Sequence, residues 1–79
     1  MNKEEALEWI SEVFEEAPGR IDADTLRKDI PGWDSLGTLS LMAALDERFD
    51  IHLSEADIEG MQSVGDVFGI LRRHGALED

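Results

Sequence analysis

Residues 34–49 read DSLGTLSLMAALDERF. The apolar residues of this stretch recur every three or four positions, which predicts an amphipathic helix from about Ser35 to Arg48. Asp34 is the expected N-cap, because its carboxylate can accept from the unpaired amides of the first turn. We expect this helix to turn one apolar stripe toward a core, formed by Leu36, Leu39, Met42, Leu45 and Phe49, with Leu41 beside it.

A first helix is predicted upstream, from roughly Lys3 to Glu16. One face is rich in glutamate, and the other is apolar at helical spacing. Trp9 lies at the edge of the apolar face, so we interpret it as a packing residue. Pro18-Gly19 should end the helix, because proline cannot continue the hydrogen-bond ladder and glycine permits a turn. The apolar face comprises Ala6, Leu7, Ile10, Val13 and Phe14.

The segment between these helices, residues 20–33, keeps no period and ends at Pro31-Gly32. It contains four large apolar residues whose spacing suits a long loop pinned onto a core, with one short helical turn. Loops of this length are unusual in so small a domain and are often functional. The four residues are Ile21, Leu26, Ile30 and Trp33.

Two more helices are predicted after a short extended connection at residues 50–53. Ser54 should cap a brief third helix ending at Gly60, and Ser63 a fourth, since each precedes an aspartate by three residues. Gly75 follows the basic last turn of the fourth helix, as is usual at a helix end. Val64, Val67, Phe68 and Leu71 form its apolar face. No segment alternates as a strand does, so the fold class is all-α: a single domain over residues 1–79 with three longer helices and one short one.

The composition of the chain excludes several classes of function. The 79 residues include 19 acidic and 7 basic side chains, for a formal net charge of −12. Such a surface repels nucleic acid and anionic lipid and attracts proteins with basic patches, although acidity also simply keeps a small domain soluble. The chain has no cysteine, no apolar run near the roughly 18 residues of a membrane span, and no apolar signal-peptide core at its start. We therefore expect a cytoplasmic monomer that neither binds nucleic acid nor inserts into membranes.

The stretch from Pro31 to Leu36 places the Ser35 hydroxyl where a long loop meets a helix N-terminus. Unpaired amides and the positive end of the helix dipole favour a phosphate there. This arrangement suits a phosphate-linked group on Ser35. Serine near a helix start is nevertheless commonplace, and from the residues alone an ordinary capping role is the commoner case.

The segment Gly32-Trp33-Asp34-Ser35-Leu36 resembles the Gly-x-Asp-Ser-Leu element that opens the second helix of acyl carrier proteins and related phosphopantetheine-binding domains. The likeness continues at the end of that helix, where Leu45 and Phe49 precede the apolar connection of Ile51 and Leu53. Ser63-Val64-Gly65-Asp66 is similar to the family's opening of the last helix. The first helix and the loop fit in length and pattern but carry no specific motif.

This resemblance implies an acyl-carrier-like helical bundle with 4′-phosphopantetheine joined to Ser35 through a phosphodiester. A separate phosphopantetheinyl transferase would install this arm from coenzyme A, using magnesium. Asp34 resembles the aspartate that assists the transfer, and Leu36 the residue that seats the helix start against partner enzymes. The implied function is a non-catalytic carrier that holds acyl groups as thioesters. It would deliver them to acyl-loading and acyl-processing enzymes with basic docking patches, in fatty acid, polyketide or related lipid and secondary-metabolite biosynthesis.

The chain departs from primary fatty-acid carriers, which often have acidic residues just after the signature. Gly37, Thr38 and Ser40 stand there instead, and Trp33 is unusually bulky. These departures fit either a specialised carrier or ordinary drift on a solvated face. A peptidyl, aminoacyl or aryl carrier is the alternative within the family, and an unmodified acidic protein-interaction domain is the alternative outside it.

No metal site or intrinsic catalysis is expected. His52 and His74 have no partners at ligand spacing. Asp22-Ala23-Asp24 begins like a calcium loop, but Arg27 stands where that loop requires glycine. A serine hydrolase would also need a histidine base and an oxyanion hole near Ser35. The apolar residues that might line an acyl cleft are interpreted as core: Met42, Leu45, Phe49, Val64, Phe68 and Leu71.

Overall fold

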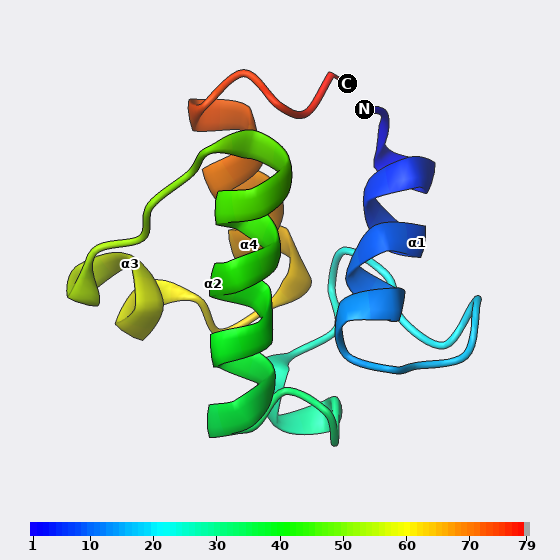
Figure 1. Ribbon diagram of the computed structural model, residues 1–79. Helices are drawn as coiled ribbons and strands as arrows, with labels where there is room; N and C mark the ends of the chain where they lie inside the picture. Colours follow the sequence, from blue (N-terminus) through cyan, green and yellow to red (C-terminus); the bar gives the residue numbers. More distant parts are fainter. Residues whose placement is uncertain (79) are drawn as a thin grey trace.

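A computed structural model of the chain describes residues 1–78, which form four α-helices and one 3-10 turn (Figure 1). Within residues 1–78, β-type pairing is limited to one isolated bridge, between Leu26 and Ser63. The all-α prediction is therefore confirmed. The elements are α1 (Lys3–Val13), η1 (Arg27–Asp29), α2 (Ser35–Phe49), α3 (Glu55–Gly60) and α4 (Val64–Arg73).

The core lies between α1, α2 and α4, with the short α3 beside them (Figure 1). Helix α1 runs antiparallel to α2, so the end of α1 and the start of α2 lie toward the same end of the bundle. Trp9 is buried and meets Phe49 edge to face, with ring centroids 5.4 Å apart, which confirms it as a packing residue. The largest fully buried side chains are Ile10, Leu41, Leu45, Ile51, Met61, Val64, Val67, Phe68 and Leu71.

The N-cap residues predicted from the sequence cap α2, α3 and α4 in the structure. The side chains of Asp34, Ser54 and Ser63 each accept the backbone N–H three residues later, at 2.8, 3.1 and 3.1 Å. Asn2 caps α1 in the same way, at 2.9 Å, which was not predicted. Each bond satisfies one of the amides that a helix start leaves unpaired.

Helix α1 ends three residues earlier than predicted, at Val13. Glu15 adopts a left-handed conformation with φ of 57°. The backbone N–H of Glu16 then donates to the Ser11 carbonyl at 2.8 Å, which closes the helix end as a Schellman motif. The prediction that Pro18-Gly19 ends this helix was therefore wrong.

The long loop is held by side chains and by backbone pairing. Ile21, Ile30 and Trp33 are buried as predicted, and the predicted helical turn is η1. The prediction that Leu26 anchors the loop was wrong, since this residue is 42% exposed. The chain is fixed there by its backbone instead, since the Arg27 N–H donates to the Gln62 carbonyl at 2.8 Å.

The core-facing side of α2 also differs from the prediction. Leu36 and Leu39 are 74% and 60% exposed, so the first half of the predicted stripe faces away from the core. The apolar residues of α2 are spread around its whole circumference. Packing against the loop buries a different face from the predicted one. The buried residues of α2 are Gly37, Thr38, Leu41 and Leu45, with Met42 and Phe49 only half-buried. In the described part of the chain, every helix is too short or too polar to cross a membrane.

Candidate functional site

Ser35 is the first residue of α2 and is exposed. Helix α2 begins at its lower end in Figure 1. Asp34, not Ser35, is the N-cap. Among the residues that the structure describes, no hydrogen bond engages the Ser35 hydroxyl. Its oxygen therefore does not cap the helix. The usual role of a serine near a helix start, capping, does not apply to Ser35.

The backbone around Ser35 suits a phosphate. Asp34 accepts from the Gly37 N–H on Oδ1 at 2.8 Å, and its carbonyl accepts from the Thr38 N–H at 2.9 Å and the Thr38 hydroxyl at 3.0 Å. These bonds leave the N–H groups of Ser35 and Leu36 without a partner in the described part of the chain. Free amides at the positive end of a helix favour a covalently held phosphate.

Two glycines let the backbone around Ser35 pack closely. A Cβ on Gly37 would collide with the carbonyl oxygen of Gly32 and lie 2.9 Å from its carbon. A Cβ on Gly32 would collide in turn with the carbonyl oxygen of Phe14. The first turn of α2 thus packs on the loop, and the loop on the residue after α1, with no side chain between. Sequence reasoning missed this contact, because no local pattern links Gly37 to Gly32.

Trp33 anchors the loop beside this site. It is 3% exposed and stacks on Phe14, with ring centroids 4.8 Å apart. The Arg27 guanidinium lies 5.8 Å from the indole ring, donates to the Trp33 carbonyl at 3.3 Å and reaches the Thr38 hydroxyl at 3.1 Å. The indole N–H is buried without a hydrogen-bond partner in the chain, at a cost of about 1–3 kcal/mol. Stacking and burial offset that cost, so Trp33 is a core residue and not an exposed recognition group.

An exposed apolar surface adjoins Ser35. The large hydrophobic side chains exposed within residues 1–78 are Leu26, Leu36 and Leu39. Two of these three lie on α2, one and four positions after Ser35. Apolar side chains left exposed together commonly mark an interaction surface.

A groove also adjoins the site, between the end of α1 and the start of α2. Its volume is about 350 Å³. The lining includes the residues on both sides of Ser35 and three carboxylates, but neither lysine nor arginine. These lining residues are Glu12, Val13, Phe14, Glu15, Gly32, Asp34, Leu36, Gly37 and Ser40.

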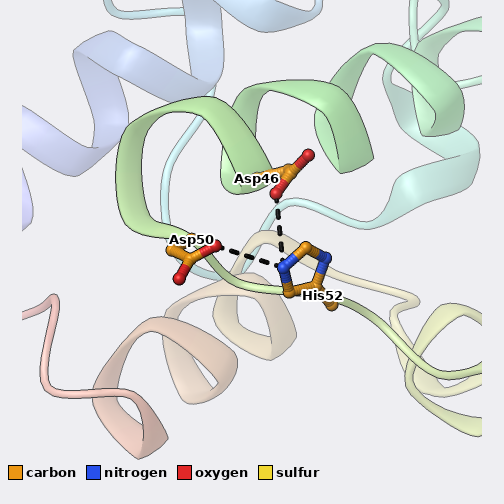
Figure 2. Close-up of side chains that lie close together, drawn as sticks. All are labelled: Asp46, Asp50 and His52. Atoms are coloured by element: carbon orange, nitrogen blue, oxygen red, sulfur yellow. Dashed lines mark hydrogen bonds and ion pairs between the residues drawn. The ribbon is translucent and has the colours of Figure 1, made fainter.

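The prediction that His52 has no partners was wrong. Figure 2 shows its Nε2 between the carboxylates of Asp50, at 3.2 Å, and Asp46, at 3.4 Å. Sequence spacing missed this cluster because the left-handed residue Asp50 turns the chain back at the end of α2. All three side chains are exposed, so we interpret the cluster as surface pairing at the negative end of the α2 dipole.

Comparison with known proteins gives the family. An acyl carrier protein from Prochlorococcus marinus (strain MIT 9515) is 34% identical over 70 residues, which cover 84% of this chain and 88% of that protein. An acyl carrier protein from Exiguobacterium sp. (strain ATCC BAA-1283 / AT1b) is 35% identical over 71 residues, covering 85% and 90%. No family model matches the chain, and no solved structure gives a significant match. With two such relatives over most of its length, the chain belongs to the acyl carrier protein family.

Proposed function

We propose that Ser35 Oγ is the attachment point of a 4′-phosphopantetheine arm. One observation carries the proposal: in a chain of this family, an exposed serine with an uncommitted hydroxyl begins α2 beside two unpaired amides. A phosphopantetheinyl transferase forms the Oγ–phosphorus bond and breaks the pyrophosphate bond of coenzyme A. Adenosine 3′,5′-bisphosphate leaves, and the serine proton is lost.

The residues around Ser35 fit this group. The amides of Ser35 and Leu36 offer donors to a phosphodiester at the helix start. Asp34 is exposed, and its Oδ1 is taken by the Gly37 N–H, so the carboxylate has its second oxygen left to face the magnesium that the transferase uses. Leu36, 74% exposed, offers an apolar surface to the enzyme.

The arm supplies a terminal thiol that holds an acyl group as a thioester. The protein's own part is to present Ser35 at the end of a rigid bundle and to bind successive enzymes weakly. A net charge of −12 favours rapid, salt-sensitive association with enzymes that have basic docking patches. We place the carrier in fatty acid, polyketide or related lipid and secondary-metabolite biosynthesis, where such enzymes act in turn on one acyl chain.

The test is intact-protein mass spectrometry after incubation with coenzyme A, magnesium and a broad-specificity phosphopantetheinyl transferase. The wild-type chain should gain one phosphopantetheinyl group, and Ser35→Ala none. Ser40→Ala is the matched control, because Ser40 is an exposed serine on the same helix. It should gain the group as the wild type does.

Two results would contradict the proposal. Modification of Ser35→Ala would move the attachment point to another residue. A folded wild-type chain that several transferases leave unmodified would favour an unmodified protein-interaction domain. Circular dichroism of Ser35→Ala should match the wild type, because the hydroxyl takes part in no described bond that holds the fold.

A further inference from the structure

We propose that the groove between α1 and α2 receives a basic and aliphatic segment of the enzyme that modifies Ser35. In this proposal Glu12 and Glu15 of the α1 end supply the attracting charge. The inference rests on the proposed function of Ser35. It adds two docking residues, Glu12 and Glu15, that lie outside α2 and outside the signature around Ser35.

The groove lies directly beside Ser35. The groove is lined by Asp34 and Leu36, the residues on both sides of Ser35. An enzyme that acts on the Ser35 oxygen has to approach both of them, and it therefore covers the mouth of the groove. The close contacts of Gly37 with Gly32, and of Gly32 with Phe14, fix the start of α2 relative to the end of α1. The groove is thus a preformed surface, which lowers the ordering cost of docking.

The groove is also acidic. Glu12, Glu15 and Asp34 are exposed around the groove, and none of its lining residues is basic. Helix α2 has no acidic residue before Asp46. Apart from Asp34, the acidic groups on the groove therefore come from the end of α1. The left-handed backbone of Glu15, closed by the bond from Glu16 to Ser11, holds that residue in a defined place.

The mixed lining identifies the occupant. Leu36 and the half-buried Val13 offer apolar surface next to the carboxylates. Lysine and arginine match this combination, because their alkyl stems pack on apolar surface while their charged ends meet carboxylates. An acyl chain would cover the three carboxylates without offering them a hydrogen-bond donor, which is costly and disfavours it as the occupant.

The test measures initial rates of modification with a broad-specificity phosphopantetheinyl transferase, coenzyme A and magnesium. Glu12→Gln/Glu15→Gln should lower kcat/KM about three- to tenfold, mainly by raising KM, and should flatten its dependence on salt. Glu4→Gln/Glu8→Gln is the matched control. It removes the same charge from exposed positions on the same helix, away from the groove, and should change kcat/KM less than about twofold.

A second pair of variants tests the groove itself and not its charge. Ser40→Phe places a bulky side chain on the lining and should lower kcat/KM by roughly threefold or more, through a clash with the docked segment. Ala56→Phe adds the same ring at an exposed position on α3 and should leave the rate near that of the wild type.

The outcomes separate the two proposals. If the wild type is never modified, even at long times, the proposed function of Ser35 fails. If the wild type is modified and Glu12→Gln/Glu15→Gln matches its Glu4→Gln/Glu8→Gln control in rate and salt dependence, only the docking groove fails. Full modification of every variant at long times, with unchanged circular dichroism, would show that slower rates do not come from unfolding.

Discussion

Gly37 of α2 and Gly69 of α4 are both helical glycines, but their surroundings are opposite. Gly37, in the first turn of α2, is buried and has no room for a Cβ, because the Gly32 carbonyl occupies that space. Gly69, in the middle of α4, is exposed, and a Cβ there would meet nothing within 4 Å. Both glycines carry the same conformational cost of about 1 kcal/mol relative to alanine in a helix.

The difference shows where this molecule gains from a weak helix former. At Gly37 the missing side chain allows direct backbone packing that fixes Ser35 relative to α1. At Gly69 no contact offsets the cost. The start of α2 is thus held by close packing, whereas the outer side of α4 faces an open hollow next to α3.

The largest expected effect is at Gly37. Gly37→Ala should destabilise the protein by about 2–3 kcal/mol, because the methyl group forces α2 away from the loop. Helix propensity alone predicts the opposite sign, a gain of up to about 1 kcal/mol. Urea denaturation followed by far-ultraviolet circular dichroism decides between them. A gain in stability would contradict this account of Gly37, because it would mean that the close contact does not exist.

Next in size is the cap beside Gly37. Asp34→Ala removes the bond to the Gly37 N–H and should cost about 1 kcal/mol, measured by the same denaturation. Ser35→Ala, one residue on, should change stability by less than about 0.5 kcal/mol. Equal effects of the two variants would mean that Ser35 shares the structural role assigned here to Asp34.

At Gly69 the sign reverses. Gly69→Ala should stabilise the protein by about 0.5–1 kcal/mol, since alanine fits the open space and restricts the unfolded chain. A rise in the urea midpoint with an unchanged slope would sharpen the contrast with Gly37. A loss of stability would show that the space around Gly69 is occupied and not open.

The smallest effect concerns an ion pair across that open side. The Ser54 backbone N–H first, and then the Arg73 guanidinium 3.0 Å away, hold the pKa of the Asp57 carboxyl below its ordinary value. A lowered folded pKa adds stability above the unfolded value, near 3.9, and that stability is lost as pH falls through the folded pKa. The stability difference between wild type and Asp57→Asn should therefore shrink from pH 6 to pH 3. Urea midpoints at the two pH values check this, and a constant difference would argue against it.

The sequence predicted the elements whose signals are local. Asp34, Ser54 and Ser63 cap their helices as expected, and Gly75 follows α4 with φ of 74°. A capping bond depends only on residues three positions apart, so no knowledge of the fold is needed. The position of Ser35 at the start of α2 was predictable for the same reason.

The errors lie where distant segments decide. Apolar residues surround α2, so periodicity could not show that Leu41 faces the core while Leu36 and Leu39 face solvent. Glutamate has little preference for the left-handed conformation, so nothing marked Glu15 as the end of α1. The groove beside Ser35 could not be predicted either, because its walls come from residues some twenty positions apart.

The burial of Trp33 has an optical consequence. The chain has two tryptophans, and Trp9 packs on Phe49 near the other end of α2. A Trp9→Phe variant would leave one fluorophore, two residues from Ser35. Its indole N–H is shielded and unpaired, so it should emit at short wavelength, and any loosening of the loop should shift the emission to the red. This bundle therefore contains an intrinsic spectroscopic reporter of events at Ser35, which requires no attached dye.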